Sequence, residues 1–358
     1  MKPAFVTACL LLFTIVACTQ PDAVVKQIKS ELPPTNALAP LYFLASDSLK
    51  GRDAFRPEIK IAARYIQQQF KEVGLLQFPE APDYAQSFPI DVVIKDNSED
   101  TFHTAGINSA IKNGTGQNII GYVKGTDPRY NDQFVLLSAH YDHIGVSKKP
   151  EMINGVADSI FNGARDNATG TTAVIDAARY FAKHPAKRPI LFIVFSAEEE
   201  GLVGSTYFAR HPVVSLNKIY CNLNIDNAGY NDTTIVTLVG SGKTSMDGII
   251  HRSTAAFGLT TINDPSPEAG LFGDSDNAPF ADAGVPAITY SLGFSRLDSV
   301  LKYLHHVTDE TSTMNMNYIL KFIEGYIFSA QSLANNSSQI QWTAGDAHEA
   351  AWHKLYGK

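Results

Sequence analysis

Residues 189–201 have the sequence PILFIVFSAEEEG, an apolar run that ends in three adjacent acids and a glycine. An uninterrupted apolar run of this length is typical of a strand buried on both faces, as in a parallel sheet covered by helices. Gly201 favours a tight turn directly after the three acids. Three carboxylates at the mouth of a buried strand repel one another unless a cation neutralises them. The stretch therefore predicts a buried strand with a cation site at its end, in preference to a solvated run of charges.

The rest of the chain repeats this alternation of apolar runs and helical patterns. Runs rich in β-branched or aromatic residues occupy 118–123, 133–139, 218–225, 234–239 and 286–291. Helical stretches fall between and after them, at 168–183, 203–210, 245–257 and 315–334. The alternation predicts an α/β fold with a mostly parallel sheet that helices cover on both faces. We also expect a helix over 57–75, irregular structure over 88–116 and a loose or partly helical tail after residue 334.

Acidic and histidine residues stand where the expected strands end. They are His140-Tyr141-Asp142, Asp166-Asn167, Glu198-Glu199, Asp226-Asn227 and either His305 or His306. Sites in open α/β sheets form at the carboxyl ends of strands, so we expect these groups to converge. Imidazoles and carboxylates without a thiolate suit a pair of Zn²⁺ ions, with one carboxylate left over as a base. The sequence therefore predicts a metal-dependent hydrolase.

The spacing within these stretches favours particular roles. His140 is a candidate ligand, and Asp142 points the same way along an extended chain. In that position Asp142 would accept the other ring N–H of His140, which fixes the tautomer and raises the ligand's basicity. Adjacent Glu198 and Glu199 suit two roles, with Glu199 as a ligand and Glu198 as the general base. Asp226 directly follows the apolar run 218–225, much as Glu198 and Glu199 follow the run that begins at residue 189. Asp226 is therefore a further candidate ligand.

Two of the stretches leave alternatives open. Asp166 precedes the helix expected over 168–183, so it is either an ordinary N-cap or a carboxylate that bridges two ions ~3.5–4 Å apart. Either His305 or His306 would complete the ligands of the second ion, and Asp309 would orient it.

Composition and charge bound the class of protein. With 358 residues, a hydrophobic content of 44% and a charged content of 18%, the chain suits one large α/β domain with short additional segments. Its formal net charge of −7 argues against a nucleic-acid partner, which would favour a basic face. Cys221 lies in an apolar run and is expected to be a buried small hydrophobe.

The N-terminus has the features of an export signal. A short basic start precedes an apolar run over 4–16 that is too short to span a bilayer. The run ends at Ile15-Val16-Ala17-Cys18, which resembles a bacterial lipobox. We expect residues 1–17 to be a signal peptide, Cys18 to carry a lipid and 18–40 to be a tether; an ordinary signal peptide cut nearby is the alternative. The protein would then be exported, as an outer-membrane lipoprotein or in the periplasm or at the cell surface.

Six stretches together resemble the secreted co-catalytic di-zinc exopeptidases, a family of bacterial leucyl aminopeptidases, glutamate carboxypeptidase and, more distantly, glutaminyl cyclase. They are LSAHYDHIG (137–145), GARDNATG (163–170), FSAEEEGLVG (195–204), NIDNAG (224–229), SDNAPFADAGVP (275–286) and HHVTDE (305–310). The resemblance covers about residues 84–334 and implies a single α/β domain with a mixed, mostly parallel sheet. We place a helical segment that packs on this domain at 41–83, and a tail at 335–358.

The family pattern implies a role for each residue of the site. One zinc would be held by His140 and Asp226 and the other by Glu199 and His305, with Asp166 as the bridge and Glu198 as the base. His305 is preferred to His306 because family members place an acid four residues after the ligand, where Asp309 stands. The implied cofactor is two Zn²⁺ ions per chain, although N/O ligands also accept Co²⁺ or Mn²⁺. The implied activity is that of an aminopeptidase acting on peptides with a free N-terminus.

The chain departs from the family pattern at two places near the substrate. Leu304 stands where family members often carry a tyrosine that stabilises the oxyanion, for which Tyr303 and Tyr290 are the candidate substitutes. The usual Ser-Asp-His stretch is Ser275-Asp276-Asn277 here.

Three other functions stay open. A carboxypeptidase needs cationic groups for a terminal carboxylate, and the candidates are Arg165, Lys243, Arg252 and Arg296. A glutaminyl cyclase would use one zinc ion and release ammonia from N-terminal glutamine. A non-catalytic binding ectodomain on this fold would have lost ligands, and none of the expected ligands is missing from the sequence.

Overall fold

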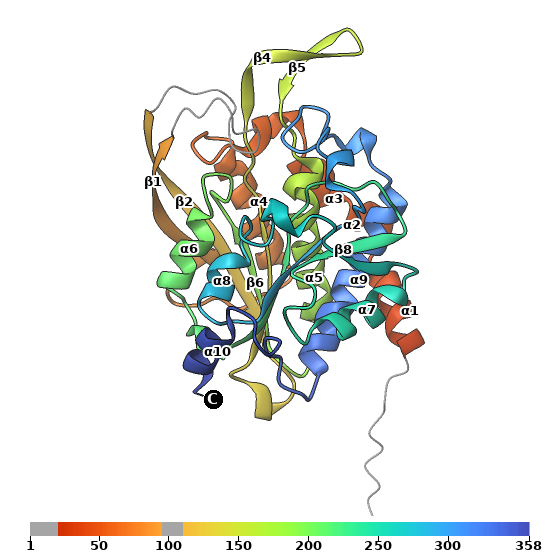
Figure 1. Ribbon diagram of the computed structural model, residues 1–358. Coiled ribbons are helices and arrows are strands. Elements are labelled where there is room, and N and C mark those ends of the chain that lie inside the picture. Colours follow the sequence, from red (N-terminus) through yellow and green to blue (C-terminus); the bar gives the residue numbers. More distant parts are fainter. Residues whose placement is uncertain (1–20, 95–109, 358) are drawn as a thin grey trace, which may run out of the picture.

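Eight strands form one sheet at the centre of the molecule, in the order β1-β2-β6-β3-β7-β10-β8-β9 (Figure 1). The computed structural model describes residues 21–94 and 110–357. The strands are β1 Ala85–Ile94, β2 Ala110–Val123, β3 Phe134–His140, β6 Ile190–Phe195, β7 Ile219–Ile225, β8 Ile235–Val239, β9 Thr260–Asn263 and β10 Ala287–Leu292. Parallel pairing joins β6, β3, β7 and β10, whereas β2 and β8 pair antiparallel with β6 and β10. The expected α/β fold with a mixed, mostly parallel sheet is confirmed.

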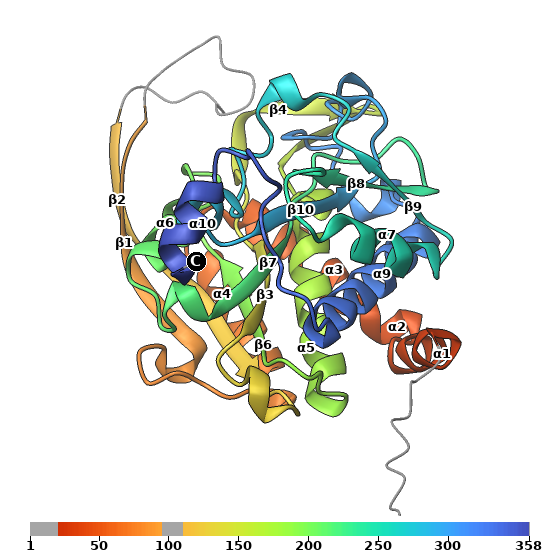
Figure 2. The same ribbon diagram turned by 60° about the horizontal axis from the view of Figure 1, so that its bottom comes forward.

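Helices cover both faces of the sheet (Figures 1 and 2). The helices of one face are α1 Pro21–Glu31, α2 Pro34–Ala37, α3 Ala39–Leu44, α4 Ile59–Glu72, α5 Gly170–Lys183, α7 Asp247–Ala255 and α9 Met316–Asn335. The other face carries α6 Val203–Arg210, α8 Ala278–Asp282 and α10 Glu349–Tyr356. In β3, Val135 and Leu137 belong to the first core and Leu136 to the second. Since neither face of this strand meets water, its sequence is apolar from Phe134 to Leu137.

Three segments differ from the expectations drawn from the sequence. Irregular structure was expected over 88–116, but residues 88–94 and 110–116 belong to the antiparallel pair β1 and β2, and residues 95–109 lie outside the described part of the chain. Along the first half of β1, buried and exposed side chains alternate, with Phe88 and Ile90 in the interior. Polar residues on either side made this two-residue alternation hard to recognise in the sequence.

The expected tether and tail are also more ordered than the sequence indicated. Residues 21–40 contain α1 and α2, because Val24 and Ile28, four positions apart, make an apolar stripe that packs on the core. The tail contains α10, and the indole rings of Trp342 and Trp352 anchor it to the second core. The expected signal peptide and the lipid-bearing Cys18 lie outside the described residues.

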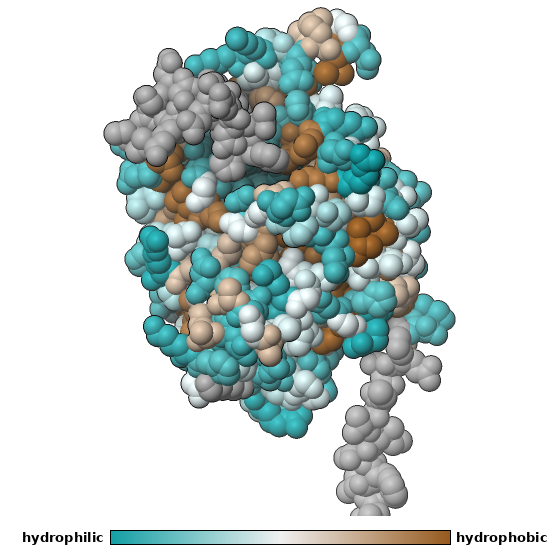
Figure 3. All heavy atoms as spheres, in the orientation of Figure 1, coloured by the Kyte–Doolittle hydropathy of each residue, from teal (hydrophilic) through white to brown (hydrophobic). Residues whose placement is uncertain are grey.

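A separate hairpin projects from the body of the protein (Figure 1). It consists of β4 Val146–Ile153 and β5 Val156–Ile160, which pair antiparallel. Met152 and Val156 are exposed next to its turn, and Figure 3 shows hydrophobic colour on this hairpin. No helix within the described part of the chain has both the length and the apolar character that a membrane crossing requires.

Candidate metal centre

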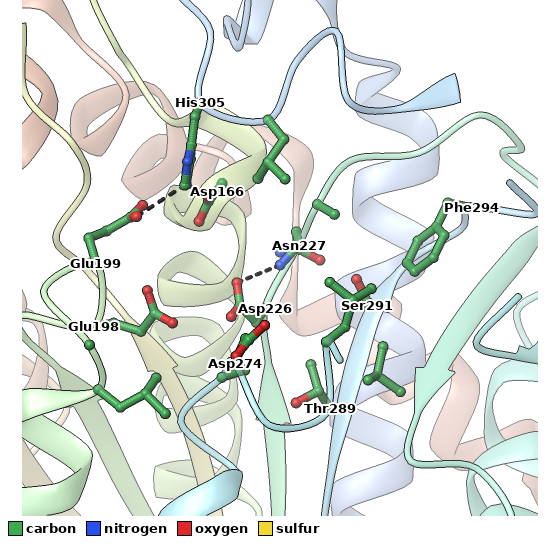
Figure 4. A pocket seen from close by; sticks show the side chains of 17 residues that line it. Asp166, Glu198, Glu199, Asp226, Asn227, Asp274, Thr289, Ser291, Phe294 and His305 are labelled. Carbon is green, nitrogen blue, oxygen red and sulfur yellow. Dashed lines mark hydrogen bonds and ion pairs between the residues drawn. The ribbon is translucent and has the colours of Figure 1, made fainter. Parts of the chain in front are cut away.

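The turns at one end of the sheet bring the candidate ligands together (Figure 4). The groups come from the end of β3 (His140), the turn before α5 (Asp166), the turn after β6 (Glu198 and Glu199), the end of β7 (Asp226) and the loop before α9 (His305). All of them except His140 line one cavity. Each acidic stretch that follows a buried strand in the sequence therefore lies at the same edge of the sheet, as the topology of α/β sheets requires.

Asp166 lies between two histidines, and each of its oxygens faces one of them. Oδ1 is 3.2 Å from His140 Nε2, and Oδ2 is 3.3 Å from His305 Nε2. His140 Nε2 is also 3.2 Å from Asp226 Oδ1, whereas His305 Nε2 is 3.1 Å from Glu199 Oε2. The arrangement consists of two ligand groups that share one carboxylate.

The spacing of these atoms fits divalent metal ions. Zinc bonds of about 2.0–2.1 Å in tetrahedral geometry place neighbouring ligand atoms about 3.3–3.4 Å apart. The four distances around Asp166, between 3.1 and 3.3 Å, are close to that value. Two groups of residues, each with ligand atoms within 4.8 Å of one another, are His140 with Glu198 and Asp226, and His143 with Asp166, Glu199 and His305.

The ionisable groups of the site depend strongly on one another. Burial disfavours the charged form of His140, but the charges of Glu198 and Asp226 outweigh it and raise the pKa of His140 well above its usual range. Burial likewise disfavours the charged form of Asp166, but the surrounding histidines, His143 first, hold the pKa of Asp166 well below its usual range. Negative charge in this buried place therefore requires nearby positive charge, which bound cations would supply.

Glu198 is set slightly apart from the ligand atoms. Its Oε2 lies 3.9 Å from His140 Nε2, farther than the 3.2 Å that separates the same nitrogen from Asp166 and Asp226. Burial and the neighbouring acids Asp226 and Glu199 raise the pKa of Glu198 well above its usual range. A carboxylate that faces the cavity next to the ligands, with a raised proton affinity, is suited to proton transfer.

Asp142 occupies the expected position but makes a different contact. His140 Nδ1 faces the backbone carbonyl oxygen of Asp142 at 3.2 Å, and the nearer carboxylate oxygen is 3.9 Å away. The buried carboxylate instead accepts hydrogen bonds from the backbone N–H groups of Glu198 and Glu199, at 3.2 and 3.3 Å. Asp142 thus holds the turn after β6, and its backbone, not its side chain, orients His140.

The two histidines before α9 point in different directions. His305 joins the cluster, while His306 is half exposed and its Nδ1 lies 3.6 Å from Glu151 on β4. Asp309 does not orient His305 as the sequence suggested. Its carboxylate is occupied by the backbone N–H groups of Arg165 and Asp166 and by the Arg165 guanidinium.

The N-terminal segment supports the same loops. Arg52 is completely buried and donates hydrogen bonds to the backbone carbonyl oxygens of Leu44, Tyr141, Asn162 and Gly163. A single guanidinium therefore ties the end of α3 to the loop after β3 and to the turn that presents Asp166.

Sequence reasoning missed one residue of the cluster, His143. Its Nδ1 lies 2.6 Å from Glu199 Oε1 and 3.7 Å from Asp166 Oδ2, and its side chain is completely buried. The signal in the sequence was a second histidine three positions after His140, within the same loop.

The cavity beside the cluster has a volume of about 270 Å³. Its lining includes the apolar residues Val239, Leu271 and Phe294, of which Phe294 lies away from the ligands, and Asp274 adds an acid next to Asp226 (Figure 4). Among the described residues that line the cavity there is no lysine or arginine. The cavity thus combines the acidic groups of the candidate metal site with apolar side chains that suit an apolar group.

The candidate carboxylate-binding residues are engaged elsewhere. Arg165 pairs with Asp309, Lys243 with Asp346 and Arg296 with Asp298, while Arg252 lies in α7 outside the cavity lining.

The candidate substitute tyrosines do not face the cavity either. Tyr290 donates its hydroxyl to the backbone oxygen of Phe322 at 3.2 Å, and the ring of Tyr303 lies 3.9 Å from the Arg165 guanidinium. Leu304 itself contributes to the lining. Of the Ser275-Asp276-Asn277 stretch, only Ser275 lines the cavity.

Known proteins resemble this chain in sequence and in fold. Aminopeptidase YwaD of Bacillus subtilis is 28% identical over 201 residues, which are 56% of this chain and 41% of that protein. The chain spans less than half the length of the first curated relatives it matches. An aminopeptidase from Aneurinibacillus sp. strain AM-1 has the same fold, with a TM-score of 0.65 at 16% identity over 90% of this chain and 98% of that one.

A second solved structure, the glutaminyl cyclase of Bacteroides thetaiotaomicron, aligns with a TM-score of 0.55 at 15% identity, over 89% of this chain and 98% of that one. The sequence model of peptidase family M28 matches residues 118–327, which include every candidate ligand. The chain belongs to peptidase family M28.

Proposed function

We propose that this protein is a zinc-dependent aminopeptidase that releases N-terminal residues from peptides. One observation carries the proposal: the carboxylate of Asp166 lies between His140 and His305, each of which faces a second carboxylate, at the edge of a cavity that Glu198 also lines. Membership of a peptidase family supports the reaction class.

In this proposal the chain holds two Zn²⁺ ions. Asp166 would be the shared ligand; His140 and Asp226 would complete one site, and Glu199 and His305 the other. Bound zinc would supply Lewis acidity, which lowers the pKa of water and stabilises negative charge on the scissile carbonyl. Glu198 accepts the proton of the attacking water and passes it to the leaving amine. Asp142 positions Glu198 and Glu199 through their backbone N–H groups.

The charges of the cavity favour a free amino terminus over a free carboxyl terminus. Asp226, Asp274 and Glu198 line it, and the described lining residues include no lysine or arginine that would pair with a terminal carboxylate. An α-ammonium group is attracted by these acids, which would confine cleavage to the first residue. This argues for an aminopeptidase over a carboxypeptidase. A glutaminyl cyclase on this fold would use one ion, so metal stoichiometry separates it from the proposal.

The test is hydrolysis of an aminoacyl-anilide by the purified protein. We expect activity that a chelator abolishes and Zn²⁺ restores, with two zinc ions per chain by elemental analysis. The substitution Glu198→Gln should leave zinc binding intact and lower kcat by orders of magnitude, since it removes the base and little else. An N-acetylated peptide should not be cleaved. Activity that persists without metal, or equal cleavage of blocked and free peptides, would refute the proposal.

We further propose that the protein is exported and anchored through a lipid on Cys18. The lipobox-like sequence before Cys18 supports this assignment. The prediction is checked by metabolic labelling with a fatty acid, which should mark the wild-type protein and not Cys18→Ser. Equal labelling of both would contradict it.

A further inference from the structure

His143 contacts Glu199, a proposed ligand of the second ion, at the carboxylate oxygen that does not face His305. Its Nδ1 lies 2.6 Å from Glu199 Oε1, and the other oxygen of that carboxylate, Oε2, faces His305 Nε2 at 3.1 Å. An ionised carboxylate only accepts hydrogen bonds, so His143 must donate its Nδ1–H. The two oxygens of Glu199 therefore have different partners: Oε1 faces His143, and Oε2 faces the ligand cluster.

The distances separate a hydrogen bond from shared metal coordination. Two atoms bound to the same zinc ion lie about 3.3 Å apart, as the ligand atoms around Asp166 do. The 2.6 Å between His143 and Glu199 is shorter than that spacing and close to the ~2.7–2.9 Å of a charge-assisted hydrogen bond. Asp166 Oδ2, which also faces His305, is 3.7 Å from His143 Nδ1, too far for a hydrogen bond.

We propose that His143 is a positioning residue for the second zinc site, which holds Glu199 by Oε1 so that Oε2 alone is presented to the ion. The inference rests on the two-zinc function proposed above. Partners behind metal ligands typically change metal affinity or activity 10–100-fold when they are removed.

The surroundings of His143 are built for this contact. The φ of Gly163 is +57°, and a Cβ at this position would come within 2.6 Å of the His143 ring. The imidazole therefore fits beside the turn before Asp166 because residue 163 is glycine. The backbone N–H of His143 donates to the carbonyl oxygen of Arg52 at 3.2 Å, which fixes the residue from the other side. The ring has little freedom to turn away from Glu199.

The remaining ring nitrogen shows that packing alone does not explain a histidine here. His143 Nε2 is buried and has no hydrogen-bond partner among the described residues. A buried polar atom without a partner is unfavourable, by about 1–3 kcal/mol, so an apolar side chain would be more stable at this position if only packing mattered. The benefit of a histidine at this position must therefore come from Nδ1, whose described hydrogen-bond partner is the Glu199 carboxylate.

The experiment compares His143→Leu with His143→Asn. Leucine removes the donor, whereas the amide nitrogen of asparagine can occupy the place of Nδ1 and donate the same hydrogen bond. Stepwise dissociation constants for the two zinc ions are measured by competition with a chromophoric chelator. His305→Ala provides the curve of a protein that has lost the second site, and His251→Leu, an exposed histidine on α7, is the matched control.

We expect His143→Leu to weaken the second ion by about 10–100-fold and to leave the first unchanged. His143→Asn should recover most of that loss. Unchanged affinity in His143→Leu, or an asparagine variant as weak as the leucine one, overturns the inference. A wild-type protein that binds fewer than two ions overturns the proposed function itself, before any substitution is compared.

Discussion

The guanidinium of Arg165 lies 2.9 Å from the carboxylate of Asp309, and both side chains are buried. The same carboxylate accepts hydrogen bonds from the backbone N–H groups of Arg165 and Asp166. Asp309 therefore fixes the turn that presents the shared carboxylate of the proposed metal site, although it is far from that turn in the sequence.

Replacing Asp309 by Asn should destabilise the protein and weaken metal binding together. The change leaves the Arg165 guanidinium buried without its counter-charge, which typically lowers the free energy of unfolding by about 3–5 kcal/mol. Urea denaturation measures the loss. Asp298→Asn, in an exposed pair with Arg296, is the control and should leave the urea midpoint unchanged. Equal effects of the two substitutions would show that the buried pair has no special role.

His305 and His306 should respond in opposite ways to substitution by alanine. His305→Ala removes a proposed ligand, so we expect loss of one zinc ion and a fall in kcat/KM of at least about 100-fold. His306→Ala removes only a half-exposed contact with Glu151, and metal content and turnover should stay within about threefold of wild type. Elemental analysis and anilide hydrolysis decide the matter. If His306→Ala loses the ion, the ligand assignment is wrong.

Most of the site could be predicted because each ligand is tied to a local pattern. His140, Glu199 and Asp226 lie at or just after the ends of buried strands, and the end of such a strand fixes where these residues lie. The alternation of β3, β6 and β7 with helices likewise predicted the sheet. These features depend on the order of residues along the chain, and little else is needed to infer them.

What could not be predicted depends on contacts between distant segments. Asp309 stands four residues after His305, yet the guanidinium of Arg165, 144 positions earlier, takes its carboxylate. His143 was missed because its partner, Glu199, reaches it only after β3 and β6 pair. Sequence spacing cannot distinguish the carboxylate of Asp142 from its backbone oxygen as the partner of His140, since both lie two residues away.

Removing bound metal should destabilise the protein, and more so at higher pH. Burial lowers the pKa values of metal-free His140 and His305, but the neighbouring acids outweigh it and raise them well above their usual range, so protons compete with metal there. Stabilisation by zinc, about 2.7 kcal/mol at one hundred times the Kd, should therefore grow as pH rises.

This effect is measured as the difference in Tm between zinc-loaded and chelator-treated protein at several pH values. Asp166→Asn, which lacks the shared carboxylate, is the control and should show little zinc-dependent stabilisation. A difference that shrinks as pH rises would contradict protonation of the histidines in the metal-free site.

Asp176 should make the protein less stable as pH rises, and its replacement by Asn should remove that dependence. Its side chain is completely buried in α5, Oδ1 accepts from Arg179 at 2.8 Å, and Oδ2 has no hydrogen-bond partner among the described residues. Burial raises the pKa of Asp176 from 3.8 to about 7. Between these values the folded protein binds more protons than the unfolded chain, so the stability that protonated Asp176 provides is present below about pH 4 and lost up to about pH 7.

The measurement is the difference in free energy of unfolding between Asp176→Asn and wild type from pH 4 to 8, because the other titrating groups cancel in that difference. Each pKa unit corresponds to about 1.4 kcal/mol, so the difference should shift by a few kcal/mol in favour of the variant and level off above pH 7. Asp132→Asn, at an exposed carboxylate paired with Lys218, should give a difference that hardly changes over this range. A pH-independent difference for Asp176→Asn would mean that the buried carboxylate is already ionised at pH 4, with Arg179 able to stabilise its charge.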